Sequence, residues 1–153
     1  MIDFRAQGIY IVINNFGGAM EFERTLVILK PDVIKRGLVG QIIKHYECKM
    51  LVIKNMKMVY ADESILNKHY KEHIGKPFYP DLIQFMKSGP VIVMMIEGIN
   101  AVETVRKING TTDPSQAECG SIRGLYANSK TENCVHGSDS IESAIRECEI
   151  WFE

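Results

Sequence analysis

The chain has 153 residues, of which 46% are hydrophobic and 24% are charged, and its formal net charge is -1. A chain of this length falls within the size range of one compact domain, and its composition is that of an ordinary globular protein. The near-neutral charge gives no extended basic surface, so we predict no specific nucleic-acid partner and expect any anion site to be local.

The cysteine spacing and the apolar runs exclude further classes. No C-x-x-C pair occurs among the four cysteines, so neither a zinc cluster nor a disulfide framework is indicated: Cys48, Cys119, Cys134 and Cys148. Reduced thiols favour a cytoplasmic protein. The longest apolar run near the N-terminus, residues 9–13, is too short for a membrane span and is followed by no convincing signal-peptide cleavage site. We therefore predict neither export nor a membrane partner.

Residues 1–20 stand apart from the pattern that follows them. They contain the β-branched run at 9–13, then Asn-Asn-Phe-Gly-Gly, and finally Met20, which is itself a possible natural start. The run suits an edge strand or an exchange contact with another subunit. An upstream-extended reading frame or added cloning residues explain the segment at least as well, and we assign it no catalytic role.

A β-α-β unit is predicted from Glu23 onward. Residues 25–29 form an apolar, partly β-branched run that Lys30-Pro31-Asp32 ends, which is typical of a central strand. Apolar residues then recur at helical spacing over 37–46, and strand character returns over 50–59.

Two helices are expected next, the first capped by Asp62-Glu63-Ser64 and the second running from about residue 80 to 87. Residues 90–97 are the most apolar stretch and predict a strand, and a helix follows over 100–108.

Residues 109–133 show no sustained period, and a loop of this length is uncommon in a compact domain unless it is functional. Residues 134–136 then predict a short last strand. Ser138 or Asp139 is expected to cap the final helix, with Trp151 and Phe152 packed near its end. This order predicts an α/β fold (an α+β sandwich), with a ferredoxin-like, four-stranded antiparallel sheet and helices packed on it.

His136 lies between the last short strand and the polar start of the final helix, in the segment Asn-Cys-Val-His-Gly-Ser-Asp-Ser. A histidine placed there can present a ring nitrogen to an incoming phosphate, because backbone N–H groups and the helix dipole favour negative charge. The alternative is a loop histidine that neighbouring carbonyls satisfy, and this segment alone leaves the two open.

Several motifs occur in order along the chain: Glu-Arg-Thr-Leu-Val-Ile-Leu-Lys-Pro-Asp, Arg-Gly-Leu-Val-Gly, His-Tyr, Lys-Pro-Phe-Tyr-Pro, Ser-Gly-Pro-Val, Asn-Gly-Thr-Thr-Asp-Pro, Ser-Ile-Arg-Gly and the His136 segment. From about Glu23 to Phe152 the chain resembles the nucleoside diphosphate kinases, which implies a kinase domain over 21–153. The resemblance implies a ping-pong reaction in which a nucleoside triphosphate (ATP, GTP or another) phosphorylates His136 and a nucleoside diphosphate collects the phosphate. Histidine suits this role because a neutral imidazole is nucleophilic near pH 7.

The resemblance also implies roles for residues around the histidine. Glu147 matches the glutamate that orients the imidazole, and Lys30 matches the phosphate-binding lysine. Tyr70 and Ser138 match residues close to the catalytic ring. Their structural alternatives are a solvated strand-end lysine, a helix-packing tyrosine and a helix-cap serine.

Five further positions match nucleotide-binding residues of the family. Arg106 and Arg123 match two arginines that hold the phosphates, where charge-assisted contacts contribute about 1.5 to 3 kcal/mol each. Thr112 matches a phosphate-bonding threonine, Asn133 a sugar-contacting asparagine and Phe78 the aromatic that stacks on any base. The alternatives are a helix-face charge for Arg106, turn residues for Thr112 and Asn133, and a core position for Phe78.

Neither standard glycine-rich nucleotide motif is present. A site built from Lys30, the two arginines and a helix N-terminus needs no glycine cradle. The implied cofactor is Mg2+, carried mainly by the nucleotide's own phosphates and waters, so we predict no protein metal cage.

Three positions depart from the family pattern: Val33 replaces a usual glycine, Cys119 a common proline and Leu125 a usual acidic residue. None removes a catalytic group. The change at Cys119 affects a long loop that helps to build subunit contacts in this family. The change at Cys119 thus bears on oligomer stability and not on activity. The resemblance implies a homo-oligomer, with dimer, tetramer and hexamer all open.

Two other functions are weighed against kinase activity. A hydrolase triad of His136, Ser138 and Asp139 is disfavoured because near-adjacent residues rarely aim at one another as required. A non-catalytic, ferredoxin-like nucleotide-sensing or binding module is the stronger alternative, since fold alone does not decide function. Four residues present together argue against it: His136, Lys30, Arg123 and Glu147.

Overall fold

The computed structural model describes residues 9–13 and 19–152, with side chains from Phe22 onward. Its elements, in chain order, are β1 Ile9–Ile13, β2 Ala19–Leu29, α1 Pro31–Lys35, α2 Val39–Glu47, β3 Val52–Val59, α3 Glu63–His69, a 3-10 helix Lys71–His73, α4 Tyr79–Met86, β4 Val91–Ile99, α5 Ala101–Asn109, a 3-10 helix Pro114–Gln116, α6 Ile122–Tyr126, β5 Val135–Gly137 and α7 Ile141–Phe152.

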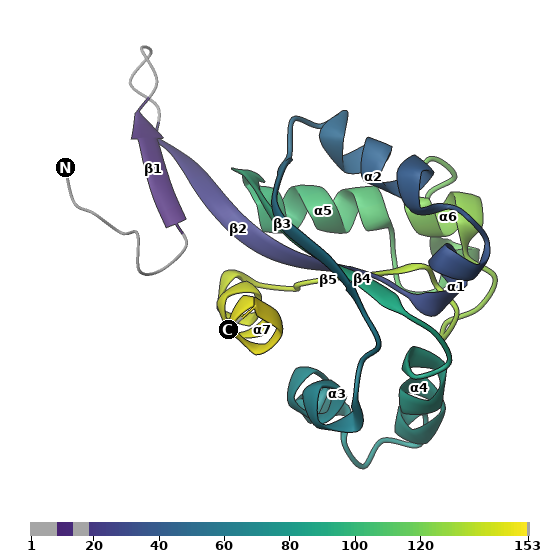
Figure 1. Cartoon of the computed structure of the whole chain (residues 1–153). Coiled ribbons are helices and arrows are strands. Elements are labelled where there is room, and N and C mark those ends of the chain that lie inside the picture. Colours follow the sequence, from purple (N-terminus) through teal and green to yellow (C-terminus); the bar gives the residue numbers. More distant parts are fainter. Residues whose placement is uncertain (1–8, 14–18, 153) are drawn as a thin grey trace.

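The strands form one antiparallel sheet in the order β1-β2-β4-β3, and β5 pairs with the C-terminal end of β2. Strands β2, β3, β4 and β5 are the four that the sequence predicts, and their order β5-β2-β4-β3 confirms the ferredoxin-like sheet. β1 adds a fifth strand at the edge (Figure 1). Residues 1–8 and 14–18 of the proposed N-terminal extension lie outside the described residues, and the origin of the extension stays a prediction.

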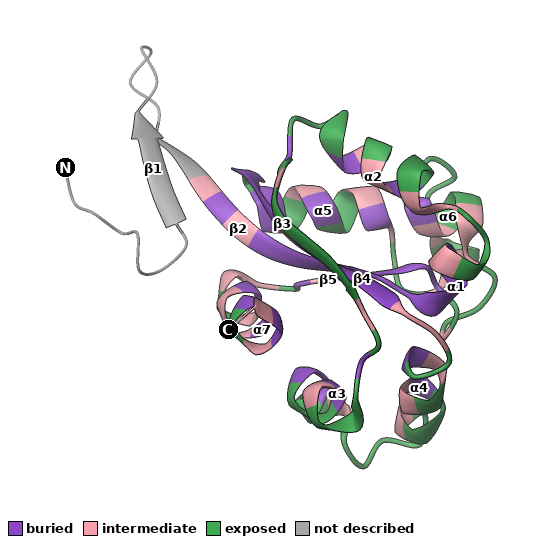
Figure 2. Ribbon diagram, viewed as in Figure 1, coloured by how far each residue is buried: buried purple, intermediate pink, exposed green. Residues whose placement is uncertain are grey.

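Helices cover both faces of the sheet (Figure 1). Along β2, Val27 and Leu29 pack into the cluster under α2, α5 and α6, whereas Leu26 and Ile28 pack into the cluster under α3, α4 and α7. Burial on both faces explains why β2 and β4 read as continuous apolar runs instead of alternating ones. Figure 2 shows these two central strands as mostly buried, in contrast to β3.

Two short helices escape the sequence prediction. Helix α1 begins at Pro31, whose fixed φ suits a first helical turn. Helix α6 lies inside the region 109–133, for which the sequence predicts no sustained element. Its N-cap is Ser121, whose hydroxyl accepts a hydrogen bond from the Gly124 N–H at 3.1 Å. Helices of five residues are too short to show a 3.6-residue period, so pattern reasoning misses them.

The predicted cap of the final helix is wrong by one or two residues. The Ser140 hydroxyl, and not Ser138 or Asp139, accepts the hydrogen bond from the Ser143 N–H, at 3.1 Å. The reason is that the Ser138 hydroxyl is already engaged in the site described below. By contrast, Asp62 caps α3 as predicted, accepting from the Ile65 N–H at 2.8 Å.

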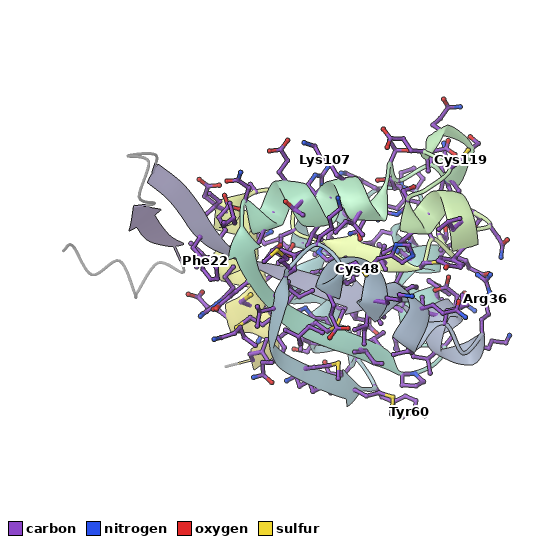
Figure 3. All side chains as sticks on the ribbon, turned by 90° about the horizontal axis from the view of Figure 1, so that it is seen from above. Phe22, Arg36, Cys48, Tyr60, Lys107 and Cys119 are labelled. Atoms are coloured by element: carbon purple, nitrogen blue, oxygen red, sulfur yellow. The ribbon has the colours of Figure 1, made fainter. Side chains whose placement is uncertain are left out.

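All four cysteines are free, as their spacing indicates. Burial raises the pKa of the Cys134 and Cys148 thiols to about 12, so both stay protonated near neutral pH. Cys48 and Cys119, both labelled in Figure 3, are exposed. Within residues 9–13 and 19–152, no helix combines the length and apolar character that a membrane span requires.

Candidate active site

A pocket of about 520 Å³ opens beside β5, between α5, α7 and the segment that joins α3 to α4. This volume is in the range of small-molecule sites. All but one of the predicted site residues line it: Lys30, Tyr70, Phe78, Arg106, Thr112, Arg123, Asn133, His136 and Glu147. Ser138 does not line the pocket, but its hydroxyl is hydrogen-bonded to Glu147, which does.

His136 reaches the pocket because β5 pairs it with Ile28 of β2, on the face of the sheet that α3 and α7 cover. Its side chain is 21% exposed, and its Nε2 lies 2.9 Å from Oε2 of Glu147. A carboxylate only accepts hydrogen bonds, so the contact places the ring proton on Nε2. The Nδ1 atom, which has no hydrogen-bond partner among the described residues, then carries the lone pair.

The residue after His136 has to be small. A Cβ on Gly137 would lie 2.7 Å from Nδ2 of Asn109 and 2.9 Å from a methyl group of Val105, both on the buried side of α5. Glycine therefore allows β5 to lie close against α5, and this close approach fixes the position of the histidine backbone.

Glu147 is held by the final helix with only 4% of its surface exposed. Its Oε2 also accepts a hydrogen bond from the Ser138 hydroxyl at 2.7 Å, and that hydroxyl accepts from the Leu26 N–H at 3.2 Å. Ser138 thus orients the glutamate and makes no direct bond to His136. The alternative hydrolase triad of His136, Ser138 and Asp139 is not formed, because the Ser138 hydroxyl donates its hydrogen bond to Glu147 and not to His136.

Lys30 is buried at the end of β2, where its ammonium group donates to Oδ1 of Asn133 at 2.6 Å. Burial, with a smaller contribution from the nearby Arg123, lowers the pKa of Lys30 to about 8, and Asp32 acts in the opposite direction. A buried cation with few partners is suited to bind an incoming anion, because its charge is weakly screened.

The two arginines differ in how firmly they are held. Arg123 donates to the backbone oxygens of Gly110 at 2.5 Å and Val135 at 2.7 Å, which fixes its guanidinium inside the loop. Burial lowers its pKa. Arg106, on α5, is exposed at the pocket wall. Nearby, the Asn133 amide donates to the backbone oxygen of Thr112 at 3.2 Å and so joins two loop segments of the wall.

Two aromatic side chains define the other wall. Phe78 is 48% exposed, with its ring 5.4 Å from that of His73, so it is not the core residue that its sequence context allows. Tyr70 is buried with its ring 6.2 Å from that of His136, and its hydroxyl has no partner among the described residues. Burial raises the pKa of this hydroxyl, which keeps it a neutral hydrogen-bond donor.

The sequence identifies no role for His69 or Arg146, yet both line the pocket. His69 is buried, with its ring 4.4 Å from that of His136. Its position three residues after Leu66 and one before Tyr70, on the buried face of α3, is the signal that could have placed it inside. Arg146 lies between Glu72, at 3.3 Å, and Oε1 of Glu147, at 3.9 Å.

A family model described as "Nucleoside diphosphate kinase" matches residues 23–153. A nucleoside diphosphate kinase of Caldanaerobacter subterraneus subsp. tengcongensis is 55% identical over 130 residues, covering 85% of this chain and 94% of the relative. One from Saccharolobus islandicus is 48% identical over 134 residues, covering 88% and 97%. The crystal structure of the apo enzyme from Encephalitozoon cuniculi superimposes with a TM-score of 0.83 at 39% identity, covering 84% of this chain and 88% of that one.

Proposed function

Because the chain belongs to the nucleoside diphosphate kinase family and is thus a nucleotide phosphotransferase, we propose that it works by ping-pong transfer through a phosphohistidine on His136. The observation that carries this proposal is the hydrogen bond between Nε2 of His136 and Glu147, which leaves Nδ1 as the free nucleophile. The lone pair adjoins a pocket that holds Lys30 and Arg123.

In the first half-reaction, the Nδ1 lone pair attacks the terminal phosphorus of a nucleoside triphosphate. The bond from that phosphorus to the bridging oxygen breaks, and the nucleoside diphosphate leaves with the electron pair. The ring then gains positive character, which the Glu147 carboxylate stabilises while the proton remains at Nε2. A terminal oxygen of another nucleoside diphosphate attacks the phosphorus in the second half-reaction and returns the lone pair to Nδ1.

The cations of the pocket hold the phosphates during both steps. We assign the terminal phosphate to Lys30 and the remaining phosphates to Arg106 and Arg123, with Thr112 as a further donor. Phe78 supplies a stacking face for the base, and Asn133 lies where it can contact the sugar. A stacked ring accepts any base, so the proposed substrates are nucleoside di- and triphosphates in general.

The proposed cofactor is Mg2+, and the residues present fit an ion that arrives with the nucleotide. Glu147 is buried and already bonded to Ser138 and His136, so it is not available for a cage of oxygen ligands. Asp139, exposed at the pocket wall, could hold one of the waters of the ion. Bound Mg2+ supplies neutralisation of phosphate charge.

The experiment that tests this function is incubation of the full chain with [γ-32P]ATP, followed by gel filtration. We expect a labelled protein whose phosphate is stable in base and labile in acid, and which is discharged by GDP, CDP or UDP. The non-catalytic nucleotide-binding module predicts nucleotide binding without any covalent label, so a label-free protein would favour that alternative.

The pKa of Lys30 predicts an alkaline limit to activity. Its pKa of about 8 means that the side chain loses its charge as the pH rises through 8. We expect kcat/KM, which reports the free enzyme, to fall about tenfold between pH 7 and pH 9. Bound phosphates stabilise the ammonium ion, so the fall in kcat should occur at higher pH. A Lys30→Arg variant, whose charge persists, serves as the control: its kcat/KM should be lower throughout but flat over this range, and a tenfold fall in it would contradict the assignment.

We also propose that the protein is a homo-oligomer that associates through the edge strand β3. Large apolar side chains are exposed on and beside this strand: Met50, Val52, Met56, Met58 and Tyr60. Figure 2 shows β3 as largely exposed, and Tyr60 lies at the margin of the molecule in Figure 3. An unpaired apolar edge tends to pair with another chain.

Light scattering after size exclusion tests this proposal. We expect a mass at least twice the 17.4 kDa of one chain. Replacing Met56 and Met58 by Lys should shift the population toward single chains, because two charges would be buried in the interface. A double replacement of Lys68 and Lys107 by Glu, on α3 and α5, is the control that should leave the mass unchanged. A parent protein that elutes as one chain would exclude the proposal.

The free thiols support the cytoplasmic location that the sequence predicts, which we retain as a proposal.

A further inference from the structure

Two imidazole rings, His69 and His136, lie next to each other in the pocket. Their centroids are 4.4 Å apart and their planes are inclined by 77°. One nitrogen of each ring and one oxygen of Glu147 lie within 4.8 Å of one another, which is close enough for the three to hold a transition-metal ion. Phosphoryl transfer needs only one of these rings as a nucleophile, so the second is a potential competitor for phosphate and a potential metal ligand.

Trp151 determines which nitrogen of His69 carries a proton. The indole Nε1–H donates a hydrogen bond to Nδ1 of His69, with the two nitrogens 3.2 Å apart. An indole N–H can only donate, so Nδ1 must keep its lone pair and the neutral ring must carry its proton on Nε2. Trp151 is 1% exposed and His69 is 4% exposed, which leaves little access for water to replace this bond.

His69 is also kept uncharged by its surroundings. Burial lowers the pKa of His69 well below its ordinary value, and His136 and Arg146 act in the same direction. The rings that contact His69 are those of His136, Tyr70 and Trp151. An oxygen of Glu147 lies within 4.8 Å of a His69 nitrogen but accepts no hydrogen bond from it. Nε2 of His69 has no hydrogen-bond partner among the described residues.

We propose that Trp151 locks His69 in its Nε2–H tautomer and thereby silences it, so that of the two adjoining rings only His136 offers a free lone pair. The indole occupies one nitrogen of His69 and a proton occupies the other. His69 is then a positioning residue: it supports the ring of His136 from the side but accepts neither a phosphoryl group nor a metal ion. The inference rests on the proposed function in one respect, since it takes His136 to be the nucleophile.

The surroundings of His69 are the reverse of those of a metal ligand. A histidine that binds a metal almost always donates its other N–H to an acceptor, whereas the other nitrogen of His69 meets a donor. Coordination through Nε2 would move the proton to Nδ1, where it would oppose the indole N–H and leave two buried donors without acceptors. Mutation of the residues that hydrogen-bond to metal-binding histidines changes metal affinity by about 10 to 100-fold.

The test compares the full chain with its Trp151→Phe variant, which keeps an aromatic ring but loses the N–H. Long-range 1H–15N spectra of the histidine rings report the tautomer directly. We expect His69 of the parent to remain neutral with its proton on Nε2 from pH 6 to 8, and Trp151→Phe to lose this preference. Zinc titration by calorimetry should show about 10 to 100-fold tighter binding to Trp151→Phe than to the parent.

A Trp151→Phe, His69→Asn double variant assigns the effect to His69, because it should return zinc binding to the level of the parent. A parent His69 with its proton on Nδ1 would overturn the proposal, even if Trp151→Phe fails to fold. Unchanged zinc affinity in a folded Trp151→Phe protein would overturn it as well. Neither readout depends on catalysis, so the proposal can fail while the kinase reaction stands, and the reverse also holds.

Discussion

A His136→Ala variant is expected to lose phosphotransfer by at least about 10⁴-fold in kcat, since removal of a nucleophile from a preorganised site has effects of this size or larger. Covalent labelling by [γ-32P]ATP should disappear at the same time. The loss should appear in kcat and not in nucleotide binding. The cations that bind the phosphates, Lys30, Arg106 and Arg123, lie on other elements of the fold and remain in the variant. Nucleotide dissociation constants should therefore change only a few-fold, as measured by calorimetry.

His45→Ala is the matched control for this variant. His45 lies on α2 against Tyr126, with the ring centroids 6.2 Å apart, and does not line the active-site pocket. Its loss should leave both the rate and the labelling close to those of the parent. Persistent labelling of His136→Ala would show that another residue carries the phosphate. His69, the adjoining imidazole, would then be the first residue to examine.

The fold could be predicted from the sequence where a long element has a clear period or a continuous apolar run, as in α2, β4 and residues 25–29 of β2. The first six residues of β2, 19–24, were not predicted as strand. The fold could not be predicted at α1 and α6, because one turn and a half of helix shows no period and a single capping serine is a common loop residue. The sequence and the structure also assign different caps to the final helix. The Ser138 hydroxyl was available in sequence terms as a cap, but a tertiary contact with Glu147 determines its orientation.

The candidate site shows the same difference: local motifs are visible in the sequence, whereas tertiary contacts are not. The motif resemblance named nine of the residues that line the pocket. It did not show that Ser138 acts on Glu147 or that Arg123 is held by backbone oxygens. The sequence indicates no role for His69 and only helix packing for Trp151. Their importance depends on a hydrogen bond between residues on two different helices, and no local pattern in the sequence reports such a contact.

A Glu147→Gln variant is expected to lower kcat by about 10² to 10⁴-fold with a smaller change in KM. The amide nearly preserves the shape of the carboxylate but removes the charge that stabilises the imidazole as positive character develops on it. The amide can also turn its NH2 group toward Nε2 of His136, which would move the ring proton to Nδ1 and occupy the nucleophilic lone pair. Rapid-quench measurement of phosphoenzyme formation isolates this step from product release.

Glu149→Gln provides the control on the same helix, since Glu149 is exposed and does not line the pocket. Thermal unfolding of both variants should separate a chemical effect from a loss of structure, because the amide nearly preserves the shape of the buried carboxylate. If Glu147→Gln formed the phosphoenzyme within about threefold of the parental rate, the charge of the carboxylate could not be what stabilises the imidazole during transfer. A slow Glu147→Gln variant with an intact fold would instead tie the rate of phosphoryl transfer to the 2.9 Å contact between Nε2 and Oε2.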